Sequence, residues 1–177
     1  MIKIAVFDLD GTLVNSLTDL AQSVNKGLKK AGLEEKPVEN YNRYVGNGRE
    51  VMIKRAMGSF ADDEEKLNIV RETFNREYKI HCNDNTCAYD GCAEMLKKLD
   101  ENGIKTAVLS NKPDEFVGKI LKKVYSEHTF AEAWGKKLEY KIKPDGEALL
   151  AILEKQGVSK EECIYIGDSD VDVYTAQ

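Results

Sequence analysis

The sequence of 177 residues contains no apolar run long enough to cross a bilayer, and its apolar start, residues 2–7, is too short for a signal peptide. Basic residues are not in excess either. The chain has 26 Lys and Arg against 31 Asp and Glu, a net charge of −5, whereas nucleic-acid binders usually present a basic face. These absences predict a cytoplasmic protein that binds neither membranes nor nucleic acid.

Paired metal-binding cysteines are also absent. The four cysteines, none of them in a CxxC pair, are Cys82, Cys87, Cys92 and Cys163. The first three lie beside His81 in "HCNDNTCAYDGC". Because structural zinc sites use tighter paired spacings, we interpret these residues as reduced thiols rather than zinc ligands.

The sequence does contain an alternation of strand and helix patterns. Short apolar runs that favour strands are residues 2–7, 104–110, 130–135 and the run that begins at Cys163. Helical patterns separate the later runs, and two of them end at Gly103 and Gly157. Such alternation is typical of a parallel sheet, so the sequence predicts an α/β fold with a Rossmann-like parallel-sheet core.

A helical insert interrupts this core after its first strand. Residues 16–82 show helical periodicity and no strand signal, and Ser16 with Asp19 has the spacing of a capping box. We therefore predict two domains. Residues 1–14 and 84–177 form the α/β core, and residues 15–83 form an inserted helical domain.

Polar clusters follow three of the predicted strands: "DLDGT", "SNKP" and "GDSDVD". Ligands of open parallel sheets bind at the carboxyl ends of the strands, so we expect Asp8, Asp10, Ser110 and Asp168 to converge there. Carboxylates that share one cleft repel each other unless a counter-charge is present. A hard cation with oxygen ligands supplies that charge, and the cluster predicts a Mg²⁺ site.

The neighbouring residue types suit a phosphate group. Gly11 permits a sharp turn that brings backbone N–H groups toward an anion, and Ser110 and Asn111 precede a helix N-terminus. A lysine would add positive charge beside the phosphoryl group. Together these features predict phosphoryl transfer to a carboxylate nucleophile, with a second carboxylate as acid and base.

In their order along the chain, "DLDGT", "SNK", "KIKPD" and "GDSDVD" resemble the four motifs of the haloacid dehalogenase superfamily. The insert resembles that superfamily's α-helical cap, and "YVGNGREVMIKRAMG" resembles the cap loop of its phosphoglycolate-phosphatase-like members. The resemblance implies that Asp8 forms an aspartyl-phosphate, and that Asp10 protonates the leaving group and then activates water. Ser110 would hold the phosphate. Mg²⁺ would bind Asp8, the backbone carbonyl of Asp10, and Asp168, with Asp172 close behind.

The same resemblance suggests residues that contact the substrate. Those around the phosphate and in the cap loop are Gly11, Thr12, Asn111, Gly46, Asn47, Gly48 and Arg49. Arg49 is the cap candidate for a substrate anion, because a guanidinium matches a carboxylate bidentately.

The lysine of the third motif has two candidates. The superfamily pattern is Lys-Pro-x-Pro-Asp, and aligning it on Pro144-Asp145 selects Lys141 as the catalytic lysine. The chain departs from this pattern by having Ile142 where proline is usual, so Lys143 stays open as the alternative.

The function implied is a Mg²⁺-dependent phosphatase acting on a small phosphorylated metabolite, with 2-phosphoglycolate as the leading substrate, in a monomer or homodimer. A pyrophosphatase, a sugar-phosphate mutase, a phosphorylated receiver domain and an inactive phosphate-binding homologue are the alternatives. Superfamily members continue with a further strand and helix beyond the position of Gln177. We expect the neighbouring strand to be exposed and the stability of this chain to be lowered.

Overall fold

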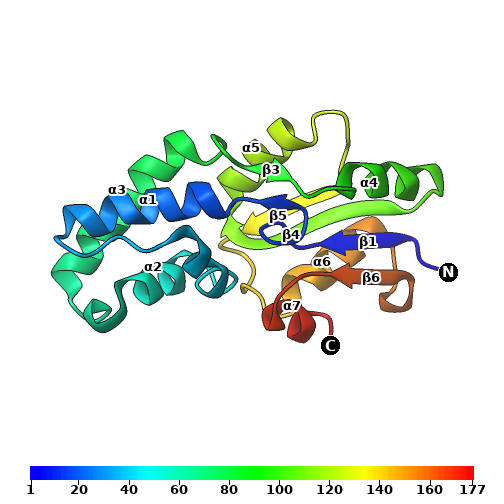
Figure 1. The fold of residues 1–177 in the computed structure, drawn as a ribbon. Coiled ribbons are helices and arrows are strands. Elements are labelled where there is room, and N and C mark those ends of the chain that lie inside the picture. The colour runs from blue at the N-terminus through cyan, green and yellow to red at the C-terminus, as the bar shows by residue number, and fades with distance from the viewer. The chain divides into compact units, whose positions relative to one another are not determined.

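A computed structural model describes residues 1–177, and the chain divides into two units (Figure 1). The core unit comprises residues 1–15 and 88–177, and the helical unit comprises residues 16–87. The sequence placed the corresponding boundaries after residues 14 and 83.

The core unit is built on a four-stranded parallel sheet. Its strands are β1 (Ile4–Phe7), β4 (Lys105–Pro113), β5 (Glu132–Lys136) and β6 (Cys163–Ile166). Their order is β5-β4-β1-β6, so β1 lies between two partners, with Phe7 beside Val108 of β4 and Ile166 of β6. All of β1 is buried, as expected for a parallel strand covered on both faces. The predicted α/β fold is confirmed.

Helices cover both faces of this sheet (Figure 1). They are α4 (Cys92–Glu101), α5 (Asp114–Val124), α6 (Glu147–Gln156) and α7 (Asp170–Thr175), with a short 3₁₀ helix η3 (Lys160–Glu162). The chain moves outward through β4 and β5 and then returns to β6, so right-handed crossovers put α4 and α5 on one face and α6 on the other. On the α6 face, Ile4 and Val6 share a buried cluster with Ile152 and Leu153.

The helical unit contains no strand apart from Cys87 at its last residue. Its elements are α1 (Leu17–Lys30), η1 (Val38–Arg43), α2 (Arg49–Met57), η2 (Gly58–Phe60) and α3 (Glu64–His81). α1 packs closely on α3 at Gly27, where a Cβ atom would press on the backbone of Val70. The helices expected from the periodicity are present. None of the helices in the chain is both long enough and apolar enough to span a membrane.

The chain passes between the units through β2 (Val14–Asn15) and β3 (Cys87–Ala88), which pair as a two-stranded sheet. In the helical unit, the buried carboxylate of Asp19 accepts hydrogen bonds from the backbone and side chains of Asn85 and Thr86, at 2.6 to 3.1 Å. The predicted capping box is wrong, because the Ser16 side chain does not cap α1. A buried carboxylate needs several donors, and the segment leaving the helical unit supplies them.

The packing of α6 can be tested by substitution. We expect Ile152→Ala to lower the free energy of unfolding by about 2–5 kcal/mol, because removing a fully buried side chain leaves a cavity. Leu150 lies on the same helix with 44% of its surface exposed, and Leu150→Ala should cost less than about 1 kcal/mol. Urea denaturation measures both values, and equal losses would contradict this orientation of α6.

Candidate active site

The carboxyl ends of β1, β4 and β6 meet at one edge of the sheet. Asp8 follows β1 directly, and its backbone N–H donates to the carbonyl of Ile166, the last residue of β6, at 2.8 Å. The strand register places Ser110 and Asp168 two positions beyond the partners of Phe7. The three polar clusters expected to converge therefore do so.

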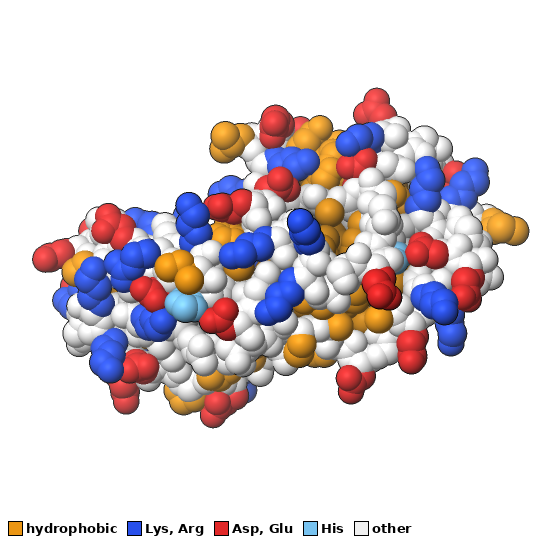
Figure 2. Space-filling model, turned by 90° about the horizontal axis from the view of Figure 1, so that it is seen from above, with side chains coloured by type: hydrophobic (Ala, Val, Ile, Leu, Met, Phe, Trp, Pro, Cys, Tyr) orange, Lys and Arg blue, Asp and Glu red, His pale blue; other side chains and the backbone are white.

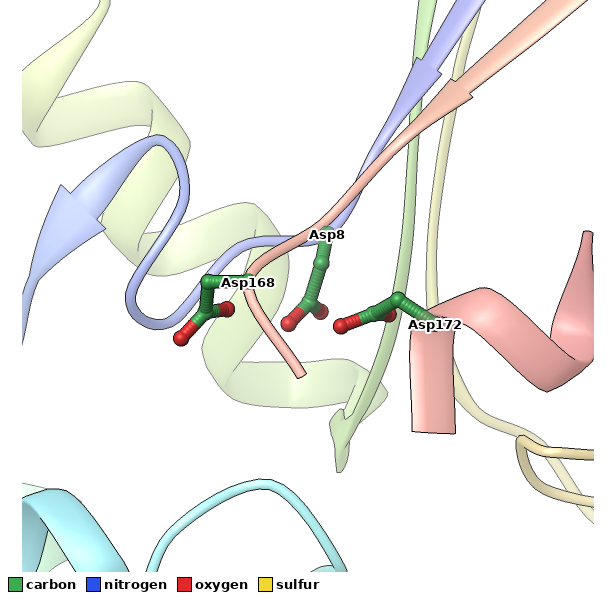
Figure 3. A group of neighbouring side chains, drawn as sticks. All are labelled: Asp8, Asp168 and Asp172. Atoms are coloured by element: carbon green, nitrogen blue, oxygen red, sulfur yellow. The ribbon is translucent and has the colours of Figure 1, made fainter. Parts of the chain in front are cut away.

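Three carboxylates lie together at this edge. Oxygen atoms of Asp8, Asp168 and Asp172 are all within 4.8 Å of one another. Figure 3 shows Asp8 between the other two, with the three carboxylates facing a common space. Carboxylates this close need a positive partner, and their oxygens are of the kind that Mg²⁺ prefers.

Two glycines leave the space that these carboxylates occupy. A Cβ atom on Gly11 would overlap the carboxylate of Asp168, and the φ angle of Gly11 is +90°, which side chains rarely allow. A Cβ atom on Gly167 would overlap the side chain of Asp172. Any larger residue at either position would displace a carboxylate of the cluster.

Gly11 and Thr12 lie in the tight turn after β1, and their predicted contact with a phosphate stays a prediction. The backbone N–H of Gly11 donates to the carbonyl of Val14 at 3.0 Å, and that of Thr12 donates to the carbonyl of Leu9 at 3.3 Å. The Thr12 hydroxyl donates to Asp168 Oδ1 at 3.1 Å. These donors close the tight turn after β1 and orient Asp168.

The positive partner of the cluster is Lys143. Its Nζ lies 2.8 Å from Asp8 Oδ1 and 2.6 Å from Asp172 Oδ1, and only 2% of its side chain is exposed. Lys141, selected from the motif pattern, instead has 74% of its side chain exposed and pairs with Asp145 at 3.3 Å. The prediction of Lys141 is therefore corrected to the alternative, Lys143.

Lys143 is held at both its side chain and its backbone. The amide of Asn111 accepts from the Lys143 backbone N–H at 2.9 Å and donates to its carbonyl at 3.0 Å. Asn111 thus anchors the lysine, and its predicted contact with substrate stays a prediction. The other carboxylate partner, Asp172, accepts at Oδ1 from Tyr165 and at Oδ2 from the Ser169 hydroxyl and backbone N–H. Asp172 therefore contacts Lys143 while its carboxylate also lies within 4.8 Å of those of Asp8 and Asp168, and its predicted role as a metal ligand stays a prediction.

Asp10 lies outside the carboxylate group and has a lysine of its own. The Nζ of Lys112 is 2.9 Å from both Oδ atoms of Asp10. Lys112 was not among the residues predicted from the sequence, although "SNKP" places it two positions after Ser110 at the same strand end. That position was the available signal, but most lysines at such positions are exposed to solvent.

The remaining predicted residues lie in two places. Ser110 is buried at the end of β4, and its hydroxyl oxygen accepts from the Lys112 backbone N–H at 3.3 Å. The loop residues Gly46, Asn47 and Gly48 precede α2 in the helical unit. Arg49 begins α2, and its guanidinium contacts Glu50 and Asn75 of the same unit. Substrate contact by these four residues stays a prediction.

Burial and charge shift the acidities of the carboxylates in different directions. Burial raises the pKa of Asp8 to about 6, opposed by the nearby Lys143 ammonium and assisted by Asp172. Burial also raises the pKa of Asp168. Burial opposes ionisation of Asp172 as well, but Lys143 and the Ser169 hydrogen bonds hold its pKa below the ordinary value. The pKa of Asp172 is thus lowered, whereas the pKa values of Asp8 and Asp168 are raised, so Asp172 ionises more readily than the other two carboxyl groups.

Comparison with known proteins finds a single family over nearly the whole chain. The model of the family described as haloacid dehalogenase-like hydrolase matches residues 5–177. A phosphoglycolate phosphatase of Mannheimia succiniciproducens is 35% identical over 98% of this chain and 80% of that protein. One from Pseudomonas savastanoi pv. phaseolicola is 34% identical over 99% of this chain. The chain spans 65% of the length of that Pseudomonas relative.

Solved structures with the same fold include one from Haemophilus somnus, described as a predicted phosphoglycolate phosphatase. It is 31% identical in sequence and has a TM-score of 0.88, over 99% of this chain and 80% of that one. A haloacid dehalogenase-like hydrolase from Bacteroides fragilis, at 26% identity, gives a TM-score of 0.88. The fold and the sequence therefore point to the same family.

The raised pKa of Asp8 predicts a pH dependence of stability. The stability that Asp8 contributes is fully present below its unfolded pKa near 4 and is lost as the pH rises through about 6. In chelator, the free energy of unfolding of the wild type should fall relative to that of Asp8→Asn by about 2 kcal/mol between pH 4.5 and 7.5. Urea denaturation across this range measures the difference, and a difference that does not change with pH would refute the raised pKa.

The assignment of Lys143 predicts a contrast between two lysines. Lys143→Met should lower the free energy of unfolding at pH 7.5 by about 3 kcal/mol, because it leaves Asp8 and Asp172 buried without their cation. The exposed Lys141 is the matched control, and Lys141→Met should change it by less than about 0.5 kcal/mol. Chemical denaturation in chelator gives both values. A larger loss for Lys141→Met would restore the original assignment.

Proposed function

This chain belongs to the haloacid dehalogenase-like hydrolase family, and from that premise we propose that it is a Mg²⁺-dependent phosphatase of small phosphomonoesters. The observation that carries the proposal is the position of Asp8, which lies at the end of the central strand with Lys143 2.8 Å away. Several relatives are named phosphoglycolate phosphatase, which makes 2-phosphoglycolate the leading substrate.

The carboxylate cluster supports Mg²⁺ as the cofactor. Asp8 and Asp168 offer oxygen atoms to a common point, and the backbone carbonyl of Asp10 is a third proposed ligand. Asp172 is a further proposed ligand, since its carboxylate belongs to the same group, and it also holds Lys143 through Oδ1. When bound, Mg²⁺ would neutralise part of the charge of Asp8 and of the substrate phosphate, and so lower the electrostatic barrier to attack.

Asp8 is the proposed nucleophile. Its ionised form is required for attack, and contact with the Lys143 ammonium favours that form against the effect of burial. An oxygen of Asp8 attacks phosphorus, the bond from phosphorus to the ester oxygen breaks, and an aspartyl-phosphate forms. Lys143 and the Ser110 hydroxyl are the proposed partners of the phosphoryl oxygens.

Asp10 is the proposed acid and base. Its carboxyl group gives a proton to the departing ester oxygen, which leaves as an alcohol. The resulting carboxylate then takes a proton from a water molecule, whose oxygen attacks the phosphorus of the aspartyl-phosphate. Inorganic phosphate is released and both aspartates return to their starting states.

The helical unit supplies the proposed substrate contacts. Gly46 and Gly48 have φ angles of +110° and +85°, so the loop that contains Asn47 has a backbone shape that few other residues permit. Arg49 follows this loop, and its guanidinium suits the carboxylate of 2-phosphoglycolate. Binding would require Arg49 to exchange its contact with Glu50 for the substrate.

The surface charges and the free cysteines bear on the partners and the location of the protein. Figure 2 shows Lys and Arg side chains interspersed with Asp and Glu on one face, which supports a small phosphorylated metabolite as the partner rather than a nucleic acid. The four cysteines are free, which supports a cytoplasmic location, and a monomer or homodimer is proposed.

Phosphate release from a substrate panel tests the proposal. The panel contains 2-phosphoglycolate, sugar phosphates and pyrophosphate, each with Mg²⁺ and with chelator. We expect Mg²⁺-dependent turnover that Asp8→Asn reduces by at least about a thousandfold, because the covalent route is lost. Asp170→Asn, an exposed acid in the same motif as Asp168, is the control.

The panel also separates the alternatives. Preference for pyrophosphate would indicate a pyrophosphatase. Transfer of phosphate between positions of a sugar would indicate a sugar-phosphate mutase. Turnover that persists in Asp8→Asn would refute the proposed nucleophile. Silence of the wild type on every substrate would favour an inactive phosphate-binding homologue.

A further inference from the structure

Lys112 is a buried cation that the proposed chemistry does not yet use. We propose that Lys112 is a positioning residue, which holds the Asp10 carboxylate in the orientation needed for its work as acid and base. This inference rests on the proposed function. It assigns Lys112 no contact with substrate.

The contact geometry is two-pronged. Lys112 Nζ lies 2.9 Å from Oδ1 and 2.9 Å from Oδ2 of Asp10. A contact to one oxygen would leave the carboxylate free to rotate about its last bond. Contact with both oxygens fixes the plane as well as the position of the group, which is the requirement for proton transfer to a defined atom.

The ion pair between Lys112 and Asp10 is buried, unlike most lysine–carboxylate pairs, which lie on the surface. Only 3% of the Lys112 side chain and 13% of the Asp10 side chain are exposed. A lysine ammonium is rarely buried without a partner, because its desolvation is costly. The contact with the Asp10 carboxylate therefore offsets the cost of burying the Lys112 ammonium.

The Lys112 backbone has close contacts on two sides, although the pairing of β4 with β5 is irregular between Leu109 and Pro113. Lys112 lies within β4, and its backbone N–H donates to the Ser110 hydroxyl oxygen. On the β5 side, Gly135 comes so close that a Cβ atom there would overlap the Lys112 carbonyl and the Asp114 backbone. Asp10, by contrast, lies in the short turn after β1. The strand thus provides a fixed point from which the turn residue can be oriented.

The two lysines serve different carboxylates. Lys143 contacts Asp8 and Asp172, whereas Lys112 contacts Asp10. Loss of the Lys112 side chain should therefore leave Asp8 and its contact with Lys143 intact. It should remove only the contact that fixes the orientation of the Asp10 carboxylate. The expected signature is a lower kcat with little change in KM.

Kinetics of Lys112→Met test this signature with 2-phosphoglycolate or the best substrate of the panel. We expect kcat to fall by about a hundredfold, the lower range of general acid–base effects, with KM changed by less than about twofold. Lys112→Arg, which retains the charge, should recover part of kcat. Lys97→Met is the control, since 77% of the Lys97 side chain is exposed. A raised KM with unchanged kcat would show that Lys112 binds substrate, and would overturn the inference.

A double-mutant cycle separates positioning from a general structural role. In an Asp10→Asn background, Lys112→Met should cause little further loss of kcat, because the oriented carboxyl group is already gone. Both steps that use Asp10, the loss of the alcohol and the attack of water, should be slowed in single-turnover measurements of Lys112→Met, because the same carboxyl group serves both. Losses of kcat that are independent and additive in the cycle would overturn the inference. If Lys112→Met does not fold, Lys112→Gln carries the same comparisons.

A structural measurement keeps this result distinct from failure of the proposed function. Crystal structures of the wild type and Lys112→Met should show one orientation of the Asp10 carboxylate in the former, and a rotated or multiple orientation in the latter. An unchanged Asp10 orientation overturns the inference whether or not the protein turns over substrate. Absence of wild-type turnover, together with a displaced Asp10 in the variant, would refute the phosphatase while leaving the positioning contact supported.

Discussion

The ion pairs of the Lys143 ammonium with Asp8 and Asp172 are the interaction on which the active-site edge depends. Asp8 and Asp172 are both buried, and without a cation they would repel each other and favour protonation. The two carboxylates differ in what surrounds them. Asp172 has three further donors from Tyr165 and Ser169, whereas burial dominates at Asp8. One lysine therefore contacts a carboxyl group whose pKa is lowered, Asp172, and another whose pKa is raised, Asp8.

The fold supplies the conditions for this contact through residues distant in sequence. The parallel register brings the ends of β1 and β6 together, and Gly167 leaves room for Asp172 to turn back toward Asp8. Asn111 reaches from β4 and bonds the backbone of Lys143 on both sides. The lysine is thus fixed before any ligand binds, and the cost of orienting it does not fall on the substrate. Such preorganisation is what an electrostatic site requires.

The sequence was sufficient for those features that depend on local pattern and sheet geometry. The apolar run before Asp8 and the strand before Asp168 predicted both residues at one edge, because parallel strands end together. The sequence was not sufficient to choose between neighbouring residues, such as two lysines, whose side chains point in different directions. Ile142 obscured the motif, and only the structure distinguishes the buried Lys143 from the exposed Lys141. The contacts of Lys112 and Asp19 join residues 102 and 66 positions apart, which no local pattern reveals.

Several of the predicted site residues share a feature that bears on how the site is organised. Gly11, Thr12, Asn111 and Asp172 were all predicted to face a ligand, and each has its donors or acceptors engaged within the protein. Polar groups near a cluster of charges must be satisfied in the free protein, so most of them form its support. The residues proposed to act on a phosphoryl group are held in the same way: both oxygens of Asp10 accept from Lys112, and Asp8 contacts Lys143. The motif residues of this chain therefore form one connected network, in which the groups proposed for the chemistry are oriented by polar contacts with their neighbours before a ligand binds.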